Sequence, residues 1–283
     1  MSLYSEIRQR IRLSGGDPKK SLGQNFLVDE RILDRIATVA TEGSMLDTPG
    51  GTTTALEIGP GPGTLTERLA RVGPVHAIEK DRRWFEFLRG HFAGDSSVTL
   101  VQGDALEQSW SDVGEGSVLV GNLPYYISAP LLIRALKHRR HFRQATFMLQ
   151  DEVASRLVAH AGTKVYGRLS VMTQLCGEVR KILRVPPGAF WPRPKVGSAV
   201  VRILFRDRID DPTFSRLEEV VQRAFAQRRK RLSNALTAGL DPKEAEKVLR
   251  QEERGFDLGA RAEAWPPETY LRWVESLKIW DES

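Results

Sequence analysis

The stretch ALEIGPGPGTLTERLA, residues 55–70, joins an apolar run to a helical segment through a turn that is rich in glycine. ALEIG predicts a buried strand, and TLTERLARVG, residues 64–73, predicts a helix. The glycines at positions 59, 61 and 63 permit the backbone to approach a ligand closely, because glycine carries no Cβ atom. The stretch therefore predicts a strand, a tight turn and a helix, the first unit of an α/β fold.

Strands and helices alternate from this stretch onward. The expected strands that follow are PVHAIE (74–79), VTLVQGD (98–104), SVLVGN (117–122) and ATFMLQ (145–150). The expected helices are DRRWFEFLRGHF (81–92), PLLIRALK (130–137) and DEVASRLVA (151–159). Two further β-rich runs within residues 180–205 are joined by a proline-rich connection and predict an antiparallel hairpin. The whole pattern is typical of βαβ units and of a mostly parallel, seven-stranded sheet.

The two ends of the chain differ from this alternating region. Residues 1–30 predict a basic helix, a break and then the segment SLGQNFLVDE, whose Asp29 caps the next helix, ERILDRIATVA (30–40). Beyond residue 206 the pattern is helical, over residues 214–236, 241–253 and 266–280. We therefore expect an α/β domain over residues 1–208 and a small all-helical domain over residues 209–283.

The chain of 283 residues has the composition of an ordinary soluble protein, with 41% hydrophobic and 28% charged residues. No apolar run approaches the ~20 residues that span a membrane, and the N-terminus lacks the apolar segment of a secretory signal. Because Cys176 is the single cysteine, the chain cannot form an internal disulfide, and we expect this side chain to be buried. A chain without disulfides is typical of a reducing compartment, so we predict a cytoplasmic protein. The five histidines fall in no ligand spacing, and no metal is expected.

Basic residues are in excess, with a formal net charge of +6 and a pI of about 9.5. This charge fits a polyanionic partner, although many basic proteins bind none. The run QRRKRLSNAL places four cations in succession on a predicted helix, so that they point all round it. The candidate RNA contacts are Arg228, Arg229, Lys230 and Arg231. The alternative is that these side chains form only a solvated or salt-bridged surface.

The glycine-rich turn fails as a dinucleotide-binding fingerprint. A G-x-G-x-x-G pattern that begins at Gly59 requires glycine or alanine at position 64, where Thr64 stands. The pattern present, E-x-G-x-G-x-G, resembles the first motif of class I methyltransferases that use S-adenosylmethionine. Taken alone, this pattern also fits a nucleotide enzyme or a tight turn between a strand and a helix.

Acidic residues stand at the ends of the next two expected strands. Glu79 ends PVHAIE, where its carboxylate could accept hydrogen bonds from both ribose hydroxyls of a cofactor. Asp104 ends VTLVQGD, where its carboxylate could accept a hydrogen bond from the adenine amino group. Ligands of open α/β sheets bind beside the carboxyl ends of strands, so both acids and the glycine turn are expected to converge on one crevice. Each acid alone is also a common structural cap.

The fourth expected strand ends in GNLPYYIS, residues 121–128. The exocyclic amine of adenine is a poor nucleophile, and acceptors near its two protons can aim its lone pair at a methyl group. Asn122 could supply one acceptor, and the carbonyl that Pro124 holds in place could supply the other. Tyr125 could stack on a base removed from its helix. The alternative is a strand-end turn with the tyrosines in the core, which we prefer for Tyr126.

With these motifs in order, the sequence resembles the KsgA family, the ribosomal RNA small-subunit adenine dimethyltransferases. The resemblance extends over nearly the whole chain and is carried by KKSLGQNFLVD, EIGPGPGTLT, Glu79, GDAL, NLPYYIS, QDEVASRL, YGRLSV, PPGAFWPRPKVGSAVV and RRKRLSNAL. It implies a class I, Rossmann-like methyltransferase domain followed by a helical RNA-binding domain. One departure is Gly197, which stands where an aspartate is expected. This position lies outside the proposed contacts with the cofactor and the base, so the departure affects the stability of the local loop and not the reaction.

The resemblance implies roles for individual residues. S-adenosylmethionine would be contacted by Asn25, Leu27, Gly59, Glu79, Asp104 and Asn122, with Gly61 and Ala105 nearby. The target amine would be held by Asn122, by the carbonyl of Leu123 before Pro124, and by Tyr125. Phe190 would close on the other face of the base, and the first 30 residues would lie over the cofactor.

The resemblance also implies a reaction and a partner. The family places two methyl groups on the 6-amino group of each of two adjacent adenosines near the 3′ end of 16S rRNA, in an immature 30S subunit during ribosome biogenesis. Two alternatives stay open: a large-subunit (23S) rRNA adenine methyltransferase of the antibiotic-resistance type, and a non-catalytic ribosome-assembly factor on the same scaffold. GQNFL, NLPYYIS and PRPKV fit the small-subunit branch better. The helical tail contains no long heptad seam, and a monomer is expected.

Overall fold

The structure is a computed structural model that describes residues 2–19, 22–42 and 53–281. The chain divides into two compact units. The first unit contains residues 1–154 and 180–205, and the second contains residues 155–179 and 206–283. The C-terminal part of the second unit therefore begins at Arg206, whereas the α/β domain was predicted to end at residue 208.

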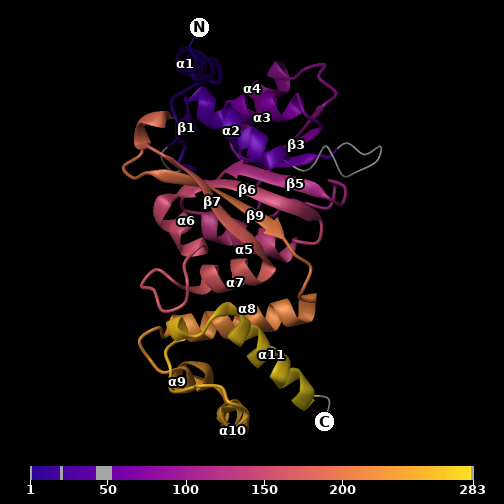
Figure 1. Cartoon of the computed structure of the whole chain (residues 1–283). Helices are drawn as coiled ribbons and strands as arrows, with labels where there is room; N and C mark the ends of the chain where they lie inside the picture. Colours follow the sequence, from indigo (N-terminus) through magenta and orange to yellow (C-terminus); the bar gives the residue numbers. More distant parts are fainter. Residues whose placement is uncertain (1, 20–21, 43–52, 282–283) are drawn as a thin grey trace. The chain divides into compact units, whose positions relative to one another are not determined.

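A seven-stranded sheet, in the order β4–β3–β2–β5–β6–β9–β7, forms the centre of the first unit (Figure 1). Its strands are β2 (Ala55–Ile58), β3 (Val75–Glu79), β4 (Val98–Gln102), β5 (Ser117–Asn122), β6 (Phe142–Gln150), β7 (Gly177–Val185) and β9 (Ser198–Phe205). The pairs from β4 to β6 are parallel, and β9 runs antiparallel to β6. The predicted mostly parallel, seven-stranded sheet is confirmed. The strand order reverses between β2 and β5, which is where such sheets bind ligands.

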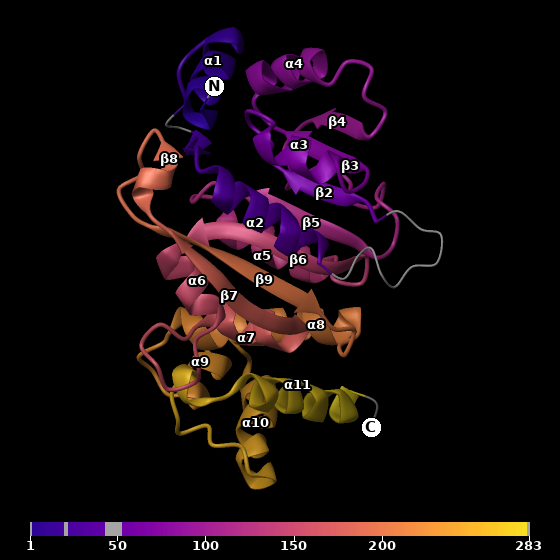
Figure 2. The same ribbon diagram turned by 45° about the horizontal axis from the view of Figure 1, so that its top comes forward.

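Helices on both faces of this sheet explain the apolar runs of its central strands. All four residues of β2 and five of the six in β5 are buried, as expected for strands covered on two sides. Helix α2 (Glu30–Thr41) lies over one face, and α5 (Ser128–Lys137) lies over the opposite face (Figure 2). The other helices that follow the strands are α3 (Thr64–Ala70), α4 (Arg82–His91) and α6 (Asp151–Leu157).

Helix α2 begins and docks through polar contacts at its two ends. Its predicted cap, Asp29, accepts a hydrogen bond from the N–H of Ile32, which satisfies one of the unpaired donors of the first turn. At the other end, the buried Gln144 of β6 donates its amide to the carbonyls of Val39 and Ala40. The apolar face of the helix is thereby held against the sheet.

The N-terminal segment joins the first unit through a contact over a long sequence distance. Helix α1 (Leu3–Leu13) matches the predicted basic helix. Strand β1 (Phe26–Leu27) then pairs antiparallel with β8 (Phe190–Trp191), which follows the 3₁₀ helix η2 (Pro187–Ala189) in the connection between β7 and β9. The sequence did not predict this small sheet, because strands of two residues carry no periodic pattern.

The second unit is helical. Its elements are α7 (Arg168–Cys176), α8 (Asp211–Ala226), α9 (Leu232–Thr237), α10 (Pro242–Leu249), η3 (Arg250–Arg254), η4 (Ala262–Ala264) and α11 (Pro267–Asp281). Helix α7 packs against α8 and α11. Residues 155–179, which the sequence assigned to the α/β domain, are grouped with this unit, and the last three of them also begin β7.

An aromatic cluster fills the interior of the second unit. The hydroxyls of Tyr166 and Tyr270 donate to the carbonyls of Trp265 and Ala262 at 2.9 and 2.7 Å, so both buried phenols are satisfied. The predicted continuous helix over residues 214–236 is wrong. The chain leaves the helix after Ala226 and starts α9 only at Leu232, because Leu232 and Ser233 donate their N–H groups to the carbonyls of Ala260 and Leu258.

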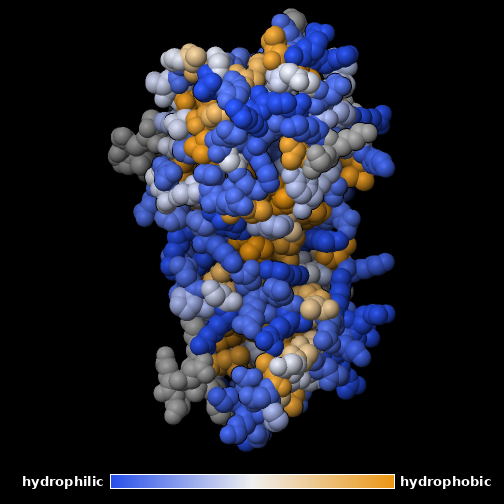
Figure 3. Space-filling view, turned by 180° about the vertical axis from the view of Figure 1, so that it is seen from behind, coloured by the Kyte–Doolittle hydropathy of each residue, from blue (hydrophilic) through white to orange (hydrophobic). Residues whose placement is uncertain are grey.

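The face drawn in Figure 3 is mostly hydrophilic, as expected for a chain with 28% charged residues. Hydrophobic side chains appear in smaller patches on this face (Figure 3). Cys176 is buried, as predicted. Among the described residues, no helix combines the length and apolar character that crossing a bilayer requires.

Candidate active site

The turn between β2 and α3 needs its predicted glycines. The φ angles are +71° at Gly59, +53° at Gly61 and +80° at Gly63, a region that side chains disfavour. A Cβ atom on Gly63 would lie only 2.7 Å from Leu88, and one on Gly61 would lie 3.1 Å from Phe26. A Cβ atom on Gly59 would meet no described atom within 4 Å. The loop is therefore packed on one side and open at Gly59.

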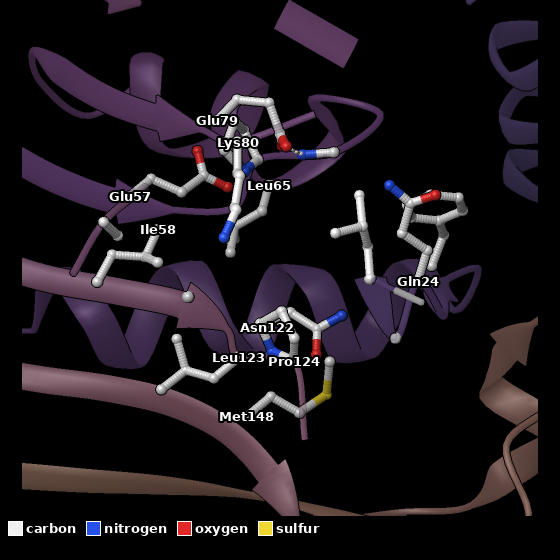
Figure 4. Close-up of a pocket in the computed structure, with 18 of the residues that line it drawn as sticks. Gln24, Glu57, Ile58, Leu65, Glu79, Lys80, Asn122, Leu123, Pro124 and Met148 are labelled. Carbon is white, nitrogen blue, oxygen red and sulfur yellow. Dashed lines mark hydrogen bonds between the residues drawn. The ribbon is translucent and has the colours of Figure 1, made fainter. Parts of the chain in front are cut away.

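This open side belongs to a pocket beside the ends of β2, β3 and β5 (Figure 4). The pocket wall brings together most of the sequence-predicted contacts: Asn25, Leu27, Gly59, Gly61, Glu79, Asp104, Ala105, Asn122, Leu123, Pro124 and Tyr125. Phe190 does not line this wall. It is 4% exposed and pairs with Leu27 in the small sheet, so its contact with a base stays a prediction.

Two buried carboxyl groups, Glu57 and Glu79, lie in the wall on neighbouring strands (Figure 4). Glu79 accepts the backbone N–H groups of Gly61 at 3.0 Å and Asp81 at 2.7 Å. Thr66 donates its hydroxyl to Glu57 at 2.7 Å. Burial raises the pKa of each carboxyl group to about 7, although the hydrogen bonds favour ionisation. Glu79 therefore ties the glycine loop to the end of β3 as well as facing the pocket.

Asp104 is paired with Lys80, which the sequence reasoning did not select. The Lys80 Nζ atom donates to Oδ2 of Asp104 at 2.5 Å, and the N–H of Leu106 donates to Oδ1 at 2.9 Å. Burial opposes the ionisation of Asp104, but these hydrogen bonds outweigh it and the pKa lies below its ordinary value. An ionised carboxylate only accepts hydrogen bonds, which suits a ligand amine. The signal that could have identified Lys80 is its position directly after Glu79.

Asn122 ends β5 at the reversal of strand order. Its Nδ2 atom donates to the carbonyl of Asn25 at 3.1 Å, so the acceptor on this side chain is Oδ1. The next N–H group, that of Leu123, donates to the carbonyl of Met148 at 3.1 Å. Two acceptors were proposed for the target amine, the Asn122 amide oxygen and the Leu123 carbonyl. The contact with Asn25 fixes the Asn122 side chain, and the contact with Met148 fixes the backbone of Leu123.

The two tyrosines after Pro124 lie in different surroundings. Tyr125 is half-buried, and its hydroxyl is 2.9 Å from the Ser198 hydroxyl at the start of β9. Tyr126 was expected in the core, and this prediction is wrong: the residue is 52% exposed and lines the pocket. The reason is that Tyr126 lies in a turn between β5 and α5, which the N–H of Ile127 closes by donating to the carbonyl of Pro124.

The N-terminal segment is attached to the pocket through Asp81. Gln24 lines the pocket and donates to Oδ2 of Asp81 at 3.0 Å, while Lys19 donates to Oδ1 at 3.1 Å. Burial opposes the ionisation of Asp81, but these donors and Arg83 outweigh it and lower its pKa to about 2. One anionic side chain therefore holds two parts of the segment that precedes β1.

Arg10 links helix α1 to the glycine loop. It is 7% exposed, donates to the carbonyl of Pro62 at 2.7 Å and pairs with Glu67 of α3 at 2.6 Å. A buried arginine needs such partners, because an unpaired charge would be costly. This basic residue of the N-terminal helix therefore serves the structure of the site.

Comparison with known proteins assigns the chain to a family. A family model described as ribosomal RNA adenine dimethylase matches residues 16–278. The chain belongs to the ribosomal RNA adenine dimethylase family. A relative from Desulfitobacterium hafniense is 42% identical over 248 residues, and the match covers 85% of each chain. A relative from Magnetococcus marinus is 41% identical over 273 residues, and the match covers 93% of each chain. Both are named ribosomal RNA small subunit methyltransferase A.

Solved structures share the fold of this dimethylase. The crystal structure of a dimethyladenosine transferase from Plasmodium falciparum superimposes with a TM-score of 0.76 at 23% identity, over 90% of this chain and 98% of that one. The crystal structure of the 23S rRNA methyltransferase ErmE gives a TM-score of 0.64 at 28% identity, over 90% of this chain and 100% of that one. The family and the methyltransferase fold that the motifs predicted are confirmed.

The basic run of this dimethylase lies on the turn between α8 and α9, not on a helix. Arg229, Lys230 and Arg231 are exposed. Arg228 is half-buried, donates to the carbonyl of Thr163 at 3.3 Å and lies 3.5 Å from a Glu263 oxygen. The structure thus presents three of the predicted cations to solvent and ties the fourth to its own unit.

The dimethylase pocket also contains residues that sequence reasoning missed. They are Gln24, Glu57, Lys80, Tyr126 and Met148. Glu57 was visible as the first letter of the glycine motif, whereas Met148 reaches the wall only because β6 lies beside β5. In the part of the chain that the structure describes, no group of His, Cys, Asp and Glu could hold a metal ion.

Proposed function

We propose that this protein transfers methyl groups from S-adenosylmethionine to the 6-amino groups of two adjacent adenosines near the 3′ end of 16S rRNA, during biogenesis of the 30S subunit. The observation that carries the proposal is one pocket that presents Glu79, Asp104 and Asn122 together beside an open glycine loop. The names of curated relatives at 40–42% identity, all small-subunit methyltransferases, support the same reaction.

The donor and acceptor set of the pocket fits S-adenosylmethionine. The ionised Asp104 would accept a hydrogen bond from the adenine amino group, and Glu79, at the end of β3, would accept hydrogen bonds from the ribose hydroxyls. The space beside Gly59 would admit the ligand against the backbone. When bound, S-adenosylmethionine supplies an electrophilic methyl group.

The chain's own contribution to transfer is to orient the target amine. The Asn122 Oδ1 atom and the Leu123 carbonyl would accept hydrogen bonds from its two N–H groups and direct the nitrogen lone pair. The hydrogen bonds from Asn122 to Asn25 and from Leu123 to Met148 hold this backbone before a base arrives, so little reorganisation is needed. The ring of Tyr125, anchored through Ser198, would stack on the base.

The small subunit is favoured over the large one because the relatives at 40–42% identity carry the small-subunit name, while ErmE is 28% identical. Purified 30S and 50S subunits should be incubated with the protein and S-adenosylmethionine labelled in its methyl group. We expect label in 30S rRNA only. Label in 50S rRNA alone would reverse the assignment, and no calorimetric binding of S-adenosylmethionine would favour a non-catalytic assembly factor.

Asn122→Ala tests the roles within the pocket. We expect this variant to lose methyl transfer while keeping its affinity for 30S subunits, because Asn122 lies in the pocket and not in the basic turn. Gln222→Ala, which removes an exposed amide on α8, is the matched control and should methylate normally. Loss of subunit binding by Asn122→Ala, with normal turnover of a free adenosine analogue, would contradict the assigned role.

A further inference from the structure

Lys80 is a cation inside a pocket whose proposed ligand also carries positive charge. Its side chain extends from the end of β3 into the pocket, where it is labelled between Glu79 and Asn122 in Figure 4. Its ammonium lies 2.5 Å from the Asp104 carboxylate. The Lys80 side chain is 52% exposed and that of Asp104 only 17%. The pair therefore joins a solvent-facing cation to a largely buried acceptor in one wall.

The carboxylate of Asp104 is held from two directions. Lys80 occupies one lone pair of Oδ2, and the N–H of Leu106 occupies one lone pair of Oδ1. An ionised carboxylate has about four acceptor positions, so a further donor can still bind. Arg134 of α5 supports this arrangement, because it donates to the carbonyls of Leu106 at 2.6 Å and Gln108 at 2.7 Å. The segment after Asp104 is therefore fixed while the carboxylate keeps acceptor capacity.

We propose that Lys80 is a cofactor-positioning residue, which acts through Asp104 by aiming its carboxylate at the adenine amino group. This inference rests on the proposed function, since it assigns Asp104 to the adenine end of S-adenosylmethionine. A charge-assisted hydrogen bond is stronger than a neutral one and fixes the acceptor more firmly. An exposed ion pair without such a task contributes little, which is the behaviour expected of Arg89 and Glu86 on α4.

A competing role has the opposite consequence. If Lys80 instead occupied the acceptor that adenine needs, the ligand would have to displace it, and removal of the ammonium would tighten binding. The two roles therefore differ in the sign of one measurement. Lys80→Met keeps an unbranched apolar stem and removes the charge. The side chain is 52% exposed, so the substitution leaves the packing of the core in place.

The test is a calorimetric titration of the full chain with S-adenosylhomocysteine, which contains the adenine, ribose and amino-acid parts of the cofactor. We expect Lys80→Met to raise Kd by about tenfold, as loss of one partly screened charge-assisted contact implies. Lys80→Arg, which retains the charge, should restore most of the affinity. The control Arg89→Met, which breaks an exposed ion pair on α4, should leave Kd unchanged.

A double-mutant cycle shows whether Lys80 acts through Asp104. In the Asp104→Asn background the ammonium has no carboxylate partner, so Lys80→Met should change Kd by less than about twofold. In methyl-transfer assays, Lys80→Met should raise the cofactor KM by a larger factor than it lowers kcat. A merely structural role would not produce this coupling, this split or the rescue by arginine.

Several results would overturn the inference. They are tighter or unchanged binding by Lys80→Met, failure of Lys80→Arg to restore binding, and an equal loss in both Asp104 backgrounds. No binding of S-adenosylhomocysteine by the unmodified protein would overturn the proposed function together with this inference. Normal binding by the unmodified protein and by Lys80→Met would overturn the inference alone.

Discussion

Replacement of Glu57 by glutamine should stabilise the protein at alkaline pH and change it little at pH 5. Glu57 is fully buried on β2, and its environment raises its pKa from 4.5 to about 7. The first cause is burial, and the charge of Glu79 adds to it, while the hydroxyl of Thr66 acts in the opposite direction. Glutamine has nearly the same shape, can accept the Thr66 hydroxyl and does not ionise.

The magnitude follows from the two protonation equilibria. The unfolded chain ionises this side chain near pH 4.5, whereas the folded chain retains the proton up to about pH 7. Stability associated with the neutral carboxyl group is fully present below pH 4.5 and is lost as the pH rises to 7. The loss amounts to about 3 kcal/mol at pH 8. Because Glu57→Gln avoids it, the variant should be more stable there by up to that amount.

Urea unfolding followed by tryptophan fluorescence measures the difference. We expect the free energy of unfolding of Glu57→Gln minus that of the unmodified protein to grow by about 2–3 kcal/mol between pH 5 and pH 8. Glu115→Gln, which changes an exposed carboxylate before β5, is the control and should show no such growth. A difference that stays constant with pH would show that Glu57 is ionised in the folded protein at pH 5, contrary to this prediction.

Three further sets of substitutions test other contacts. In urea titrations, Asp81→Asn should lower the free energy of unfolding by about 2 kcal/mol at pH 7 and by less at pH 3. The reason is that the stabilisation from the lowered pKa of Asp81 is lost as the pH falls from 3.8 to about 2. Gly63→Ala should lower the thermal unfolding temperature, at a cost of about 1–3 kcal/mol, since φ is +80° and the new Cβ would lie 2.7 Å from Leu88; an unchanged temperature would contradict the crowding. Replacement of Arg229, Lys230 and Arg231 by glutamine should weaken 30S binding and reduce the slope of log K against log salt by about two, as filter-binding titrations at several salt concentrations would show; an unchanged slope would remove these residues from the RNA contact.

The reliable predictions from sequence concern features that are local in the chain. The glycines of the first turn were identified from their spacing between a strand and a helix, and each occupies a backbone conformation that side chains disfavour. Glu79, Asp104 and Asn122 were placed in one crevice because each was expected to end a strand, and parallel strands end at the same edge of the sheet. This topological rule makes three distant residues predictable without any knowledge of their contacts.

The predictions that failed concern features that packing decides. The helix expected over residues 214–236 is interrupted, since the backbone near Leu232 bonds to residues about 25 positions later. Tyr126 was expected in the core on its apolar ring alone, but the turn after Pro124 directs it to the pocket surface. Helix α7, which lies within the predicted α/β domain, packs against α8 and α11 of the second unit.

The α/β architecture, the glycine loop and the acidic strand ends could be predicted without a structure, because periodicity and turn chemistry act within a few residues of chain. The folded chain was needed to show which distant groups meet: Arg10 with Pro62, Asn122 with Asn25, and β1 with β8. It was also needed to show that Lys80 reaches Asp104 and that Phe190 is buried. Such contacts depend on where whole elements pack, and no local pattern of residues encodes that placement.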